Sequence, residues 1–214
     1  MQKLHALVLG ATGATGRELV NCLLRNTSFI KVSVFVRGNV NISHKNLIVH
    51  KINFSRLHEY QELIYGDVLF SALGTTRKDA GSKEKQYLVD YTYQYEFAKI
   101  ASINKVSLYS LVSSIGANKK SFLFYPSLKG TLEESVKNLN FNRVHIFQPP
   151  SLIRQKDLIR NIESISIWSL KIVNQMGLLR SFKPLLVRDL AKKMIHESLL
   201  YQSNRVTIYS AEDL

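Results

Sequence analysis

The sequence predicts an α/β protein in which a doubly wound parallel sheet is covered by helices on both faces. Three observations predict this class: short runs rich in Val, Ile and Leu alternate with amphipathic stretches, these runs are almost uninterruptedly apolar, and a glycine-rich turn follows the first run. Strands buried on both faces have this composition, and right-handed crossovers place helices on both sides of the sheet. No linker or repeat divides the 214 residues, so a single domain over 1–214 is expected.

The expected elements alternate along the chain. In the first helix, Leu19, Val20 and Leu23 fall on one face, as the periodicity of an amphipathic helix requires. The region over roughly 151–203 is expected to form a small helical extension on the substrate side. The expected strands cover residues 4–9, 31–36, 46–52, 67–73, 107–112, 143–147 and 205–208. The expected helices cover residues 15–25, 57–65, 83–103, 127–138, 159–175 and 188–201.

The composition narrows the classes of partner. A formal charge of +13 favours anionic partners, such as a phosphorylated cofactor or an acidic substrate. The basic residues are spread along the chain, and nucleic-acid binding would rest on charge alone, so no nucleic-acid partner is expected. No apolar run reaches the length that spans a bilayer, and no membrane partner is expected.

The single cysteine, Cys22, excludes an intramolecular disulfide. The N-terminal apolar run is too short for the core of a signal peptide and opens into a glycine-rich turn. These observations predict a reducing, cytoplasmic location. The six histidines show no metal-ligand spacing, so the sequence predicts no metal site.

The glycine-rich turn joins the first expected strand to the first helix. Glycines at this spacing let the backbone turn tightly, approach a pyrophosphate and pack the helix close to the sheet. The helix N-terminus then presents free N–H groups to the phosphates. The turn predicts a Rossmann-type dinucleotide site, with a tight turn that binds no ligand as the alternative. The expected cofactor-binding residues of this turn are Gly10, Ala11, Thr12, Gly13, Ala14, Thr15 and Gly16.

The second expected strand ends at Arg37, with no acid nearby. An NAD site usually places Asp or Glu about 20 residues beyond the glycines, where the carboxylate binds the ribose hydroxyls. A guanidinium suits the 2′-phosphate of NADP(H) instead. The sequence therefore favours NADP(H) over NAD(H), with Arg37 as the phosphate ligand; an ordinary surface arginine in a loop is the alternative.

Tyr125 and Lys129 are four residues apart, so on a helix they share one face. An ammonium beside a phenol favours the phenolate, which suits a group that exchanges a proton with a carbonyl substrate. Pro126 fits the first helical position and would leave Tyr125 as the cap residue. Ser113 and Ser114 follow the fifth expected strand, where a hydroxyl can bind a substrate carbonyl; the alternative is that both cap the strand end.

Together these motifs resemble an atypical, extended-type short-chain dehydrogenase/reductase of the NAD(P)H-binding-like group. The chain is most similar to the branch of HIV-Tat-interacting protein-like oxidoreductases. The similarity runs in family order across nearly the whole chain. The matching stretches are residues 10–16, 71–77, 80–81, 89–91, 112–117, 124–125, 129–130, 147–152 and 187–191.

The resemblance implies a Ser–Tyr–Lys centre. Ser114 would match the catalytic serine, with Ser113 the less favoured choice. Tyr125 would donate the proton, and Lys129 would assist it and bind the nicotinamide ribose. The further cofactor-binding residues that the resemblance implies are Leu73, Gly74, Thr75, Ser113, Pro149 and Leu152. The chain departs from the family where it has Gln148-Pro149-Pro150, since the family often has Arg-Pro-Gly there.

The motifs and the resemblance lead to two hypotheses for the function. The first is an NADPH-dependent oxidoreductase that reduces a small carbonyl substrate. The second is a non-catalytic NADPH-sensing protein that regulates a protein partner. Both need the glycine turn, and only the first needs Tyr125 and Lys129 to react. The substrate pocket is expected from residues after Ser151, including Trp168 and Met176, although helical core packing is the favoured explanation for these two residues.

Overall fold

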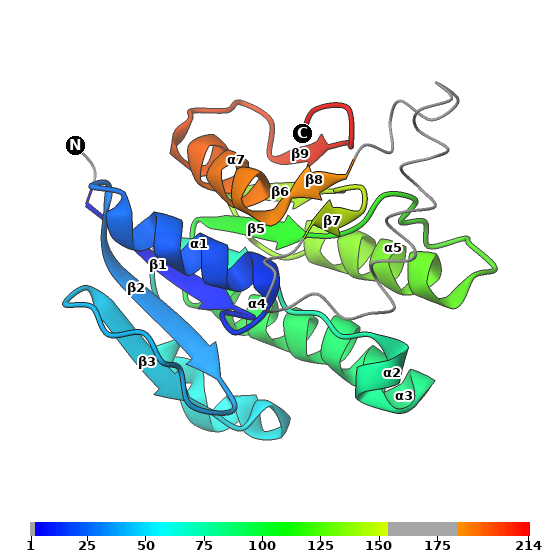
Figure 1. Ribbon diagram of the computed structural model, residues 1–214, viewed down its shortest axis with the longest axis horizontal. Coiled ribbons are helices and arrows are strands. Elements are labelled where there is room, and N and C mark those ends of the chain that lie inside the picture. Colours follow the sequence, from blue (N-terminus) through cyan, green and yellow to red (C-terminus); the bar gives the residue numbers. More distant parts are fainter. Residues whose placement is uncertain (1–2, 154–183) are drawn as a thin grey trace.

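A computed structural model describes residues 3–153 and 184–214 of the chain. Seven strands form one parallel sheet in the order β3-β2-β1-β4-β5-β6-β9 (Figure 1). The order reverses beside β1, which is the topological switch point where such sheets bind ligands. The strands are β1 (Leu4–Leu9), β2 (Phe29–Val36), β3 (Leu47–Lys51), β4 (Val68–Ser71), β5 (Leu108–Val112), β6 (Arg143–Phe147) and β9 (Val206–Tyr209).

Helices cover both faces of the sheet, as the sequence predicts (Figure 1). One face carries α1 (Ala14–Arg25) and α7 (Val187–Leu199), which pack against each other. The other face carries α4 (Tyr93–Ile103) and α5 (Phe124–Lys137). Three shorter helices precede α4: the 3₁₀ helix η1 (Phe54–Leu63), α2 (Arg77–Ala80) and α3 (Lys83–Tyr87). Beside the main sheet, β7 (Leu152–Ile153) pairs in parallel with β8 (Leu185–Leu186).

The alternation of side chains along each strand builds two hydrophobic cores. Leu7 of β1 faces the core beneath α4 and α5, while Val8 faces the core beneath α1 and α7. Leu23 of α1 and Met194 of α7 meet in the second core, and both are fully buried. Although the sequence placed residues 188–201 in a substrate-side region, α7 covers the sheet itself.

A π-helical turn interrupts the long helix that the sequence predicts over 83–103. The turn η2 (Leu88–Thr92) lies between α3 and α4, and it carries the fully buried Asp90. π-Turns are rare and often occur at functional sites. Apolar residues recur at helical spacing on both sides of the turn, so the sequence predicts one continuous helix.

Other boundaries also differ from expectation. The helix expected over 57–65 is the 3₁₀ helix η1 over Phe54–Leu63, and α5 begins at Phe124 instead of at Ser127. Tyr125 therefore lies inside the first helical turn and is not the cap residue; Leu123 is the cap. Pro126 is tolerated because the N–H groups of the first turn have no helical partner. The helix expected over 159–175 lies outside the described residues.

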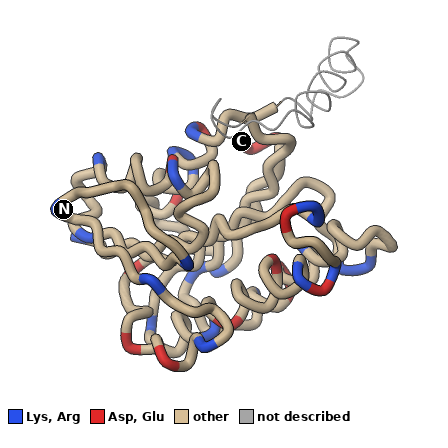
Figure 2. The backbone as a smooth tube through the Cα atoms, turned by 60° about the horizontal axis from the view of Figure 1, so that its bottom comes forward, with Lys and Arg blue, Asp and Glu red and all other residues tan. Residues whose placement is uncertain are grey.

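Charged residues are distributed over many elements of the fold (Figure 2). Within residues 3–153 and 184–214, no helix is long and apolar enough to cross a membrane.

Candidate dinucleotide-binding and active site

The glycine-rich turn has the geometry that a dinucleotide requires. Gly10 has φ +84°, a left-handed conformation that favours glycine, and a Cβ there would lie 2.5 Å from the backbone of Ala72. A Cβ on Gly16 would overlap the carbonyl oxygen of Gly10. Gly13 differs, because its nearest neighbour would be the Gly10 oxygen at 3.4 Å. Gly10 and Gly16 thus shape the turn, while Gly13 keeps an open face toward a ligand.

Helix α1 begins at Ala14, within this glycine-rich stretch, with Gly13 as its N-cap. No side chain caps the helix, and its first turn contains no acid. The free N–H groups and the positive end of the helix dipole therefore favour an anion at this position. These residues fit the pyrophosphate of a dinucleotide.

A cavity of about 640 Å³ opens beside the turn and collects many of the predicted site residues. The turn contributes Gly13, Ala14 and Thr15, and the segment after β4 contributes Leu73, Gly74 and Thr75. The other described residues that line it are Ala72, Thr76, Arg77, Asp79, Gln86, Asp90, Val112, Ser113, Phe124, Tyr125, Lys129 and Leu152. Parallel strands bring these segments together at their carboxyl ends.

Tyr125 and Lys129 enter this cavity from α5. The Tyr125 side chain is 41% exposed, whereas Lys129 is 4% exposed. The Lys129 ammonium nitrogen lies 6.0 Å from the centre of the Tyr125 ring. The predicted pair therefore shares one wall of the cavity, with the lysine deep inside and the tyrosine at the mouth.

Asp90 adds a buried carboxylate to the same cavity. Its Oδ1 accepts a hydrogen bond from the backbone N–H of Thr75 at 2.7 Å, and Gln86 Nε2 donates to its Oδ2 at 3.4 Å. Burial raises the pKa of Asp90, while the positive charge of Lys129 opposes that rise. Asp90 was not predicted as a site residue; its signal in the sequence is an acid in the middle of an otherwise apolar helical pattern.

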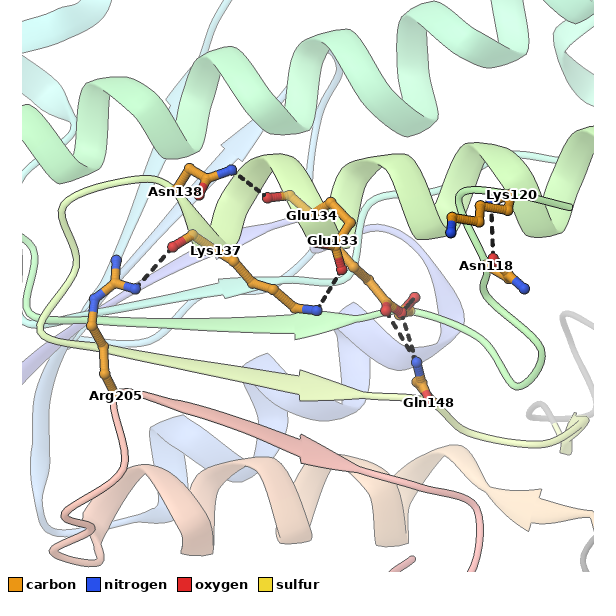
Figure 3. Close-up of polar contacts among 9 residues, drawn as sticks. Asn118, Lys120, Glu133, Glu134, Lys137, Asn138, Gln148 and Arg205 are labelled. Atoms are coloured by element: carbon orange, nitrogen blue, oxygen red, sulfur yellow. Dashed lines mark hydrogen bonds and ion pairs between the residues drawn. The ribbon is translucent and has the colours of Figure 1, made fainter.

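The structure separates the two serines. Ser113 is buried and lines the cavity, and its hydroxyl donates a short hydrogen bond to the carboxylate of Glu133 on α5. Gln148 Nε2 also donates to Glu133, at 3.1 and 3.0 Å to the two carboxylate oxygens (Figure 3). The Ser114 hydroxyl donates to the carbonyl oxygen of Ile115 at 3.2 Å, and Ser114 is not among the residues lining the cavity. Glu133 was not predicted from the sequence, because its contacts with Ser113 and Gln148 arise only in the folded chain.

A second cavity, of about 390 Å³, lies against the other side of the glycine turn. Ala11, Thr12 and Arg17 line it, and Asn39 and Asn41 come from the loop after β2.

The predicted phosphate ligand Arg37 is exposed at the end of β2 and lines neither cavity. Pro149 is buried and does not line either cavity; its carbonyl accepts from the N–H of Ile115 at 3.0 Å. Arg17 is a basic residue that the sequence analysis did not single out.

The glycine turn, the sheet order and the shared cavity agree with what is found by comparison with known proteins. Residues 10–140 match the model of the NAD(P)H-binding family. The chain belongs to this family. It carries an NAD(P)H-binding domain with a Rossmann-type α/β fold, which confirms the fold class and the resemblance stated from the motifs.

Relatives and solved structures extend the match. Protein FMP52, mitochondrial, of Kluyveromyces lactis is 36% identical over 156 residues, which cover 72% of this chain and 70% of that protein. Protein HTATIP2 of Rattus norvegicus is 34% identical over 157 residues, which cover 72% of this chain and 64% of that protein. The Bordetella bronchiseptica enzyme WbmH in complex with NAD⁺ has a TM-score of 0.73 at 14% identity, covering 98% of this chain and 75% of that chain. This last similarity shows the fold alone.

The comparisons overturn the expected cytoplasmic location. FMP52 relatives from Kluyveromyces lactis, Scheffersomyces stipitis and Candida glabrata are named mitochondrial. The expectation rested on the lack of a signal-peptide core and on the single Cys22. Both observations argue only against secretion, and neither distinguishes the reducing compartments of a cell.

Proposed function

We propose that this protein is an NADPH-dependent oxidoreductase that reduces a small carbonyl compound. One observation carries the proposal: the glycine turn, Tyr125, Lys129 and Ser113 line a single cavity. Of the two serines, we assign the role to Ser113, because it lines the cavity and Ser114 does not. The deep position of Lys129 and the outer position of Tyr125 suit a cofactor that lies along the floor of the cavity beneath the substrate.

Each residue would have a distinct task. Gly13 and the N-terminus of α1 would hold the pyrophosphate, and Lys129 would hold the nicotinamide ribose and favour loss of the Tyr125 proton. NADPH, when bound, supplies a hydride to the carbonyl carbon. Tyr125 would donate its proton to the oxygen of the substrate as negative charge develops there. Asp90 would keep the segment after β4 in place through its hydrogen bond to Thr75.

The preference for NADP(H) over NAD(H) is part of this proposal. Residues 37–42 contain no acid that could bind the ribose hydroxyls of NAD. Arg17 lines the second cavity, and Arg37 stands at the end of β2. Two guanidinium groups near the glycine turn suit a 2′-phosphate.

We further propose a mitochondrial location, which rests on the names of the FMP52 relatives. Fractionation of cells that express the tagged chain tests it. Enrichment of the chain with a mitochondrial marker is expected, and exclusive recovery with a cytosolic marker would contradict it.

The substitution Tyr125→Phe tests the proposed chemistry. Purified protein is first titrated with NADPH and then assayed against a panel of aldehydes, ketones and quinones. Loss of the proton donor should lower turnover by roughly 10² to 10⁴-fold while NADPH affinity is kept. Lys129→Met should lower both turnover and NADPH affinity. Equal turnover by Tyr125→Phe and the unaltered protein would refute the Ser–Tyr–Lys assignment.

The second candidate function is a non-catalytic NADPH sensor that regulates a protein partner. The contact between Ser113 and Glu133 favours it, because a hydroxyl that donates to a carboxylate has no proton left for a substrate carbonyl. Tight NADPH binding without turnover of any panel compound, together with an NADPH-dependent change in association with a captured partner, would favour this function.

A further inference from the structure

The loop between β5 and α5 carries two apolar side chains that the fold leaves in solvent. Phe122 is 106% exposed and Leu123 is 69% exposed. The loop reaches beyond the N-terminal end of α5 (Figure 1). Phe122, Tyr201 and Leu123 are the three most exposed large apolar side chains of the described residues, and adjacent exposed apolar side chains often mark a site of interaction. Residues 119–123 are called the apolar tip below.

The apolar tip is held in place by hydrogen bonds. The Asn118 side chain accepts from the backbone N–H of Lys120 at 2.8 Å (Figure 3), and the Asn118 carbonyl accepts from the N–H of Ser121 at 2.9 Å. The Asn118 N–H in turn donates to the carbonyl of Pro126 at 2.9 Å, which ties the loop to α5. The Ser121 hydroxyl accepts from the N–H of Leu123 at 3.1 Å.

Gly130 allows this loop to lie directly on α5. A Cβ at residue 130 would overlap the backbone of Asn118 and Lys119, so only glycine permits the contact. The outward positions of Phe122 and Leu123 are therefore set by the backbone of the fold. A surface that is ordered before it binds loses less conformational entropy on binding.

Positive charge accompanies the apolar tip. Lys119 and Lys120 are both exposed, residues 113–132 contain no acid, and Glu134 of α5 lies near enough to Lys119 to interact with its charge. Figure 2 shows basic residues on this projecting loop. A third lysine, Lys83 of α3, places its ammonium nitrogen 5.6 Å from the centre of the Phe124 ring, the first residue of α5.

We propose that the apolar tip binds the surface of a bilayer that contains anionic phospholipid. Phe122 and Leu123 would enter the boundary between headgroups and acyl chains, and Lys119 and Lys120 would bind headgroup phosphates. Lysines beside exposed aromatic and aliphatic residues are the combination that interfacial segments use. No membrane partner was expected from the sequence because it contains no apolar run long enough to span a bilayer, but a peripheral contact needs no such run.

The charge of the loop favours this occupant over another protein. The core of a protein interface is depleted of lysine, whereas the surface of an anionic membrane attracts lysines beside the inserted residues. The same contact would bring the mouth of the cavity, where Phe124 and Tyr125 lie, close to the lipid.

Vesicle co-sedimentation of the full chain tests the proposal. The vesicles contain phosphatidylcholine alone or with phosphatidylglycerol. We expect binding to the anionic vesicles only, and a loss at high salt because ions screen the lysines. Phe122→Ser with Leu123→Ser should lower the partition coefficient by about tenfold or more, since the apolar area no longer leaves water. Lys119→Ser with Lys120→Ser should lower it by roughly tenfold.

Matched controls separate this effect from a general loss of apolar surface or charge. Leu200→Ser with Tyr201→Ser removes exposed apolar groups elsewhere, and Lys45→Ser with Lys51→Ser removes exposed charge on the β3 side. Both controls should bind vesicles like the unaltered chain, and all variants should keep their NADPH affinity. Absence of vesicle binding, or equal binding by the tip variants and the controls, would overturn the proposal. So would self-association in sedimentation velocity that Phe122→Ser abolishes without vesicle binding, because it would assign the tip to a second copy of the chain.

Discussion

Gly16 lies directly against the carbonyl oxygen of Gly10, so closely that any Cβ at residue 16 would overlap that oxygen. Gly13 lies between them in the sequence, yet a Cβ there would meet only the same oxygen at 3.4 Å. The fold therefore requires the two glycines that flank Gly13, whereas the space beside Gly13 would admit a side chain.

Gly13→Val and Gly16→Ala should therefore fail in different ways. Gly13 has φ −73° and ψ 170°, which any residue can adopt, so Gly13→Val should fold normally and lose dinucleotide binding. Gly16→Ala should lower the free energy of unfolding by about 3 kcal/mol, since the backbone must move to admit the methyl group. Denaturant unfolding and NADPH titration of both variants check this. A folded Gly13→Val with unchanged NADPH affinity would refute the site.

Arg37 and Arg17 should determine the preference for NADPH. A charge-assisted hydrogen bond contributes about 1.5–3 kcal/mol. Arg37→Ala should weaken NADPH binding roughly tenfold to a hundredfold and change NADH binding little. Arg17→Ala tests whether the arginine that lines the second cavity makes this contact with the 2′-phosphate. Fluorescence titration with both cofactors measures the ratio. If both cofactors weaken equally, that arginine does not recognise the 2′-phosphate.

Ser113→Ala and Ser114→Ala form a pair that tests which serine serves the reaction. Ser113 lines the cavity, so Ser113→Ala should lower turnover by roughly tenfold to a hundredfold, the value of a hydrogen bond to the substrate oxygen as negative charge develops on it. Ser114→Ala should leave turnover within about twofold, because its hydroxyl donates to the neighbouring Ile115 carbonyl. The rate is measured with a panel compound that the unaltered protein reduces. The opposite ranking would return the role to Ser114.

His145 should make the fold sensitive to acid. It is fully buried, its ring nitrogens have no partner among the described residues, and burial lowers its pKa to about 4. Between pH 6.5 and pH 4 the unfolded chain binds a proton at this residue and the folded chain does not. Stability is therefore lost as pH falls, by up to about 1.4 kcal/mol per pH unit for one histidine.

Urea unfolding between pH 7 and pH 4.5 measures this dependence, with His145→Leu as the test variant. His5, whose pKa burial also lowers to about 4, stays in the variant, so the slope should become smaller without vanishing. An unchanged slope in His145→Leu would show that His145 does not titrate as described.

The layout of the sheet could be predicted from sequence because each buried strand is a distinct apolar run and the glycine turn identifies the first crossover. The choice between Ser113 and Ser114 could not be predicted from the sequence. Successive residues at the end of a strand point in different directions, and the sequence does not determine where the strand ends. The predicted start of α5 differs from the observed one for a similar reason, because Pro126 is compatible with several positions in the first turn of a helix.

The contacts of Glu133 and Arg17 depend on tertiary structure. Glu133 meets Gln148 only because β6 ends beside α5, and Arg17 lines the second cavity only because the loop after β2 folds over the glycine turn. Neither proximity has a local sequence signal. Arg37 could be singled out because its position after the second strand is itself a local feature.

The π-helical turn at Leu88–Thr92 makes this site sensitive to chain length. Such a turn holds one residue more than an α-helical turn, and each residue of a regular helix rotates the chain by about 100°. Deleting one residue here would join α3 and α4 into a regular helix and turn Asp90 away from Thr75, while the core contacts of Phe97 further along α4 stayed in register. The loss of a single codon at this point would thus change the charge of the cavity in evolution without repacking the protein.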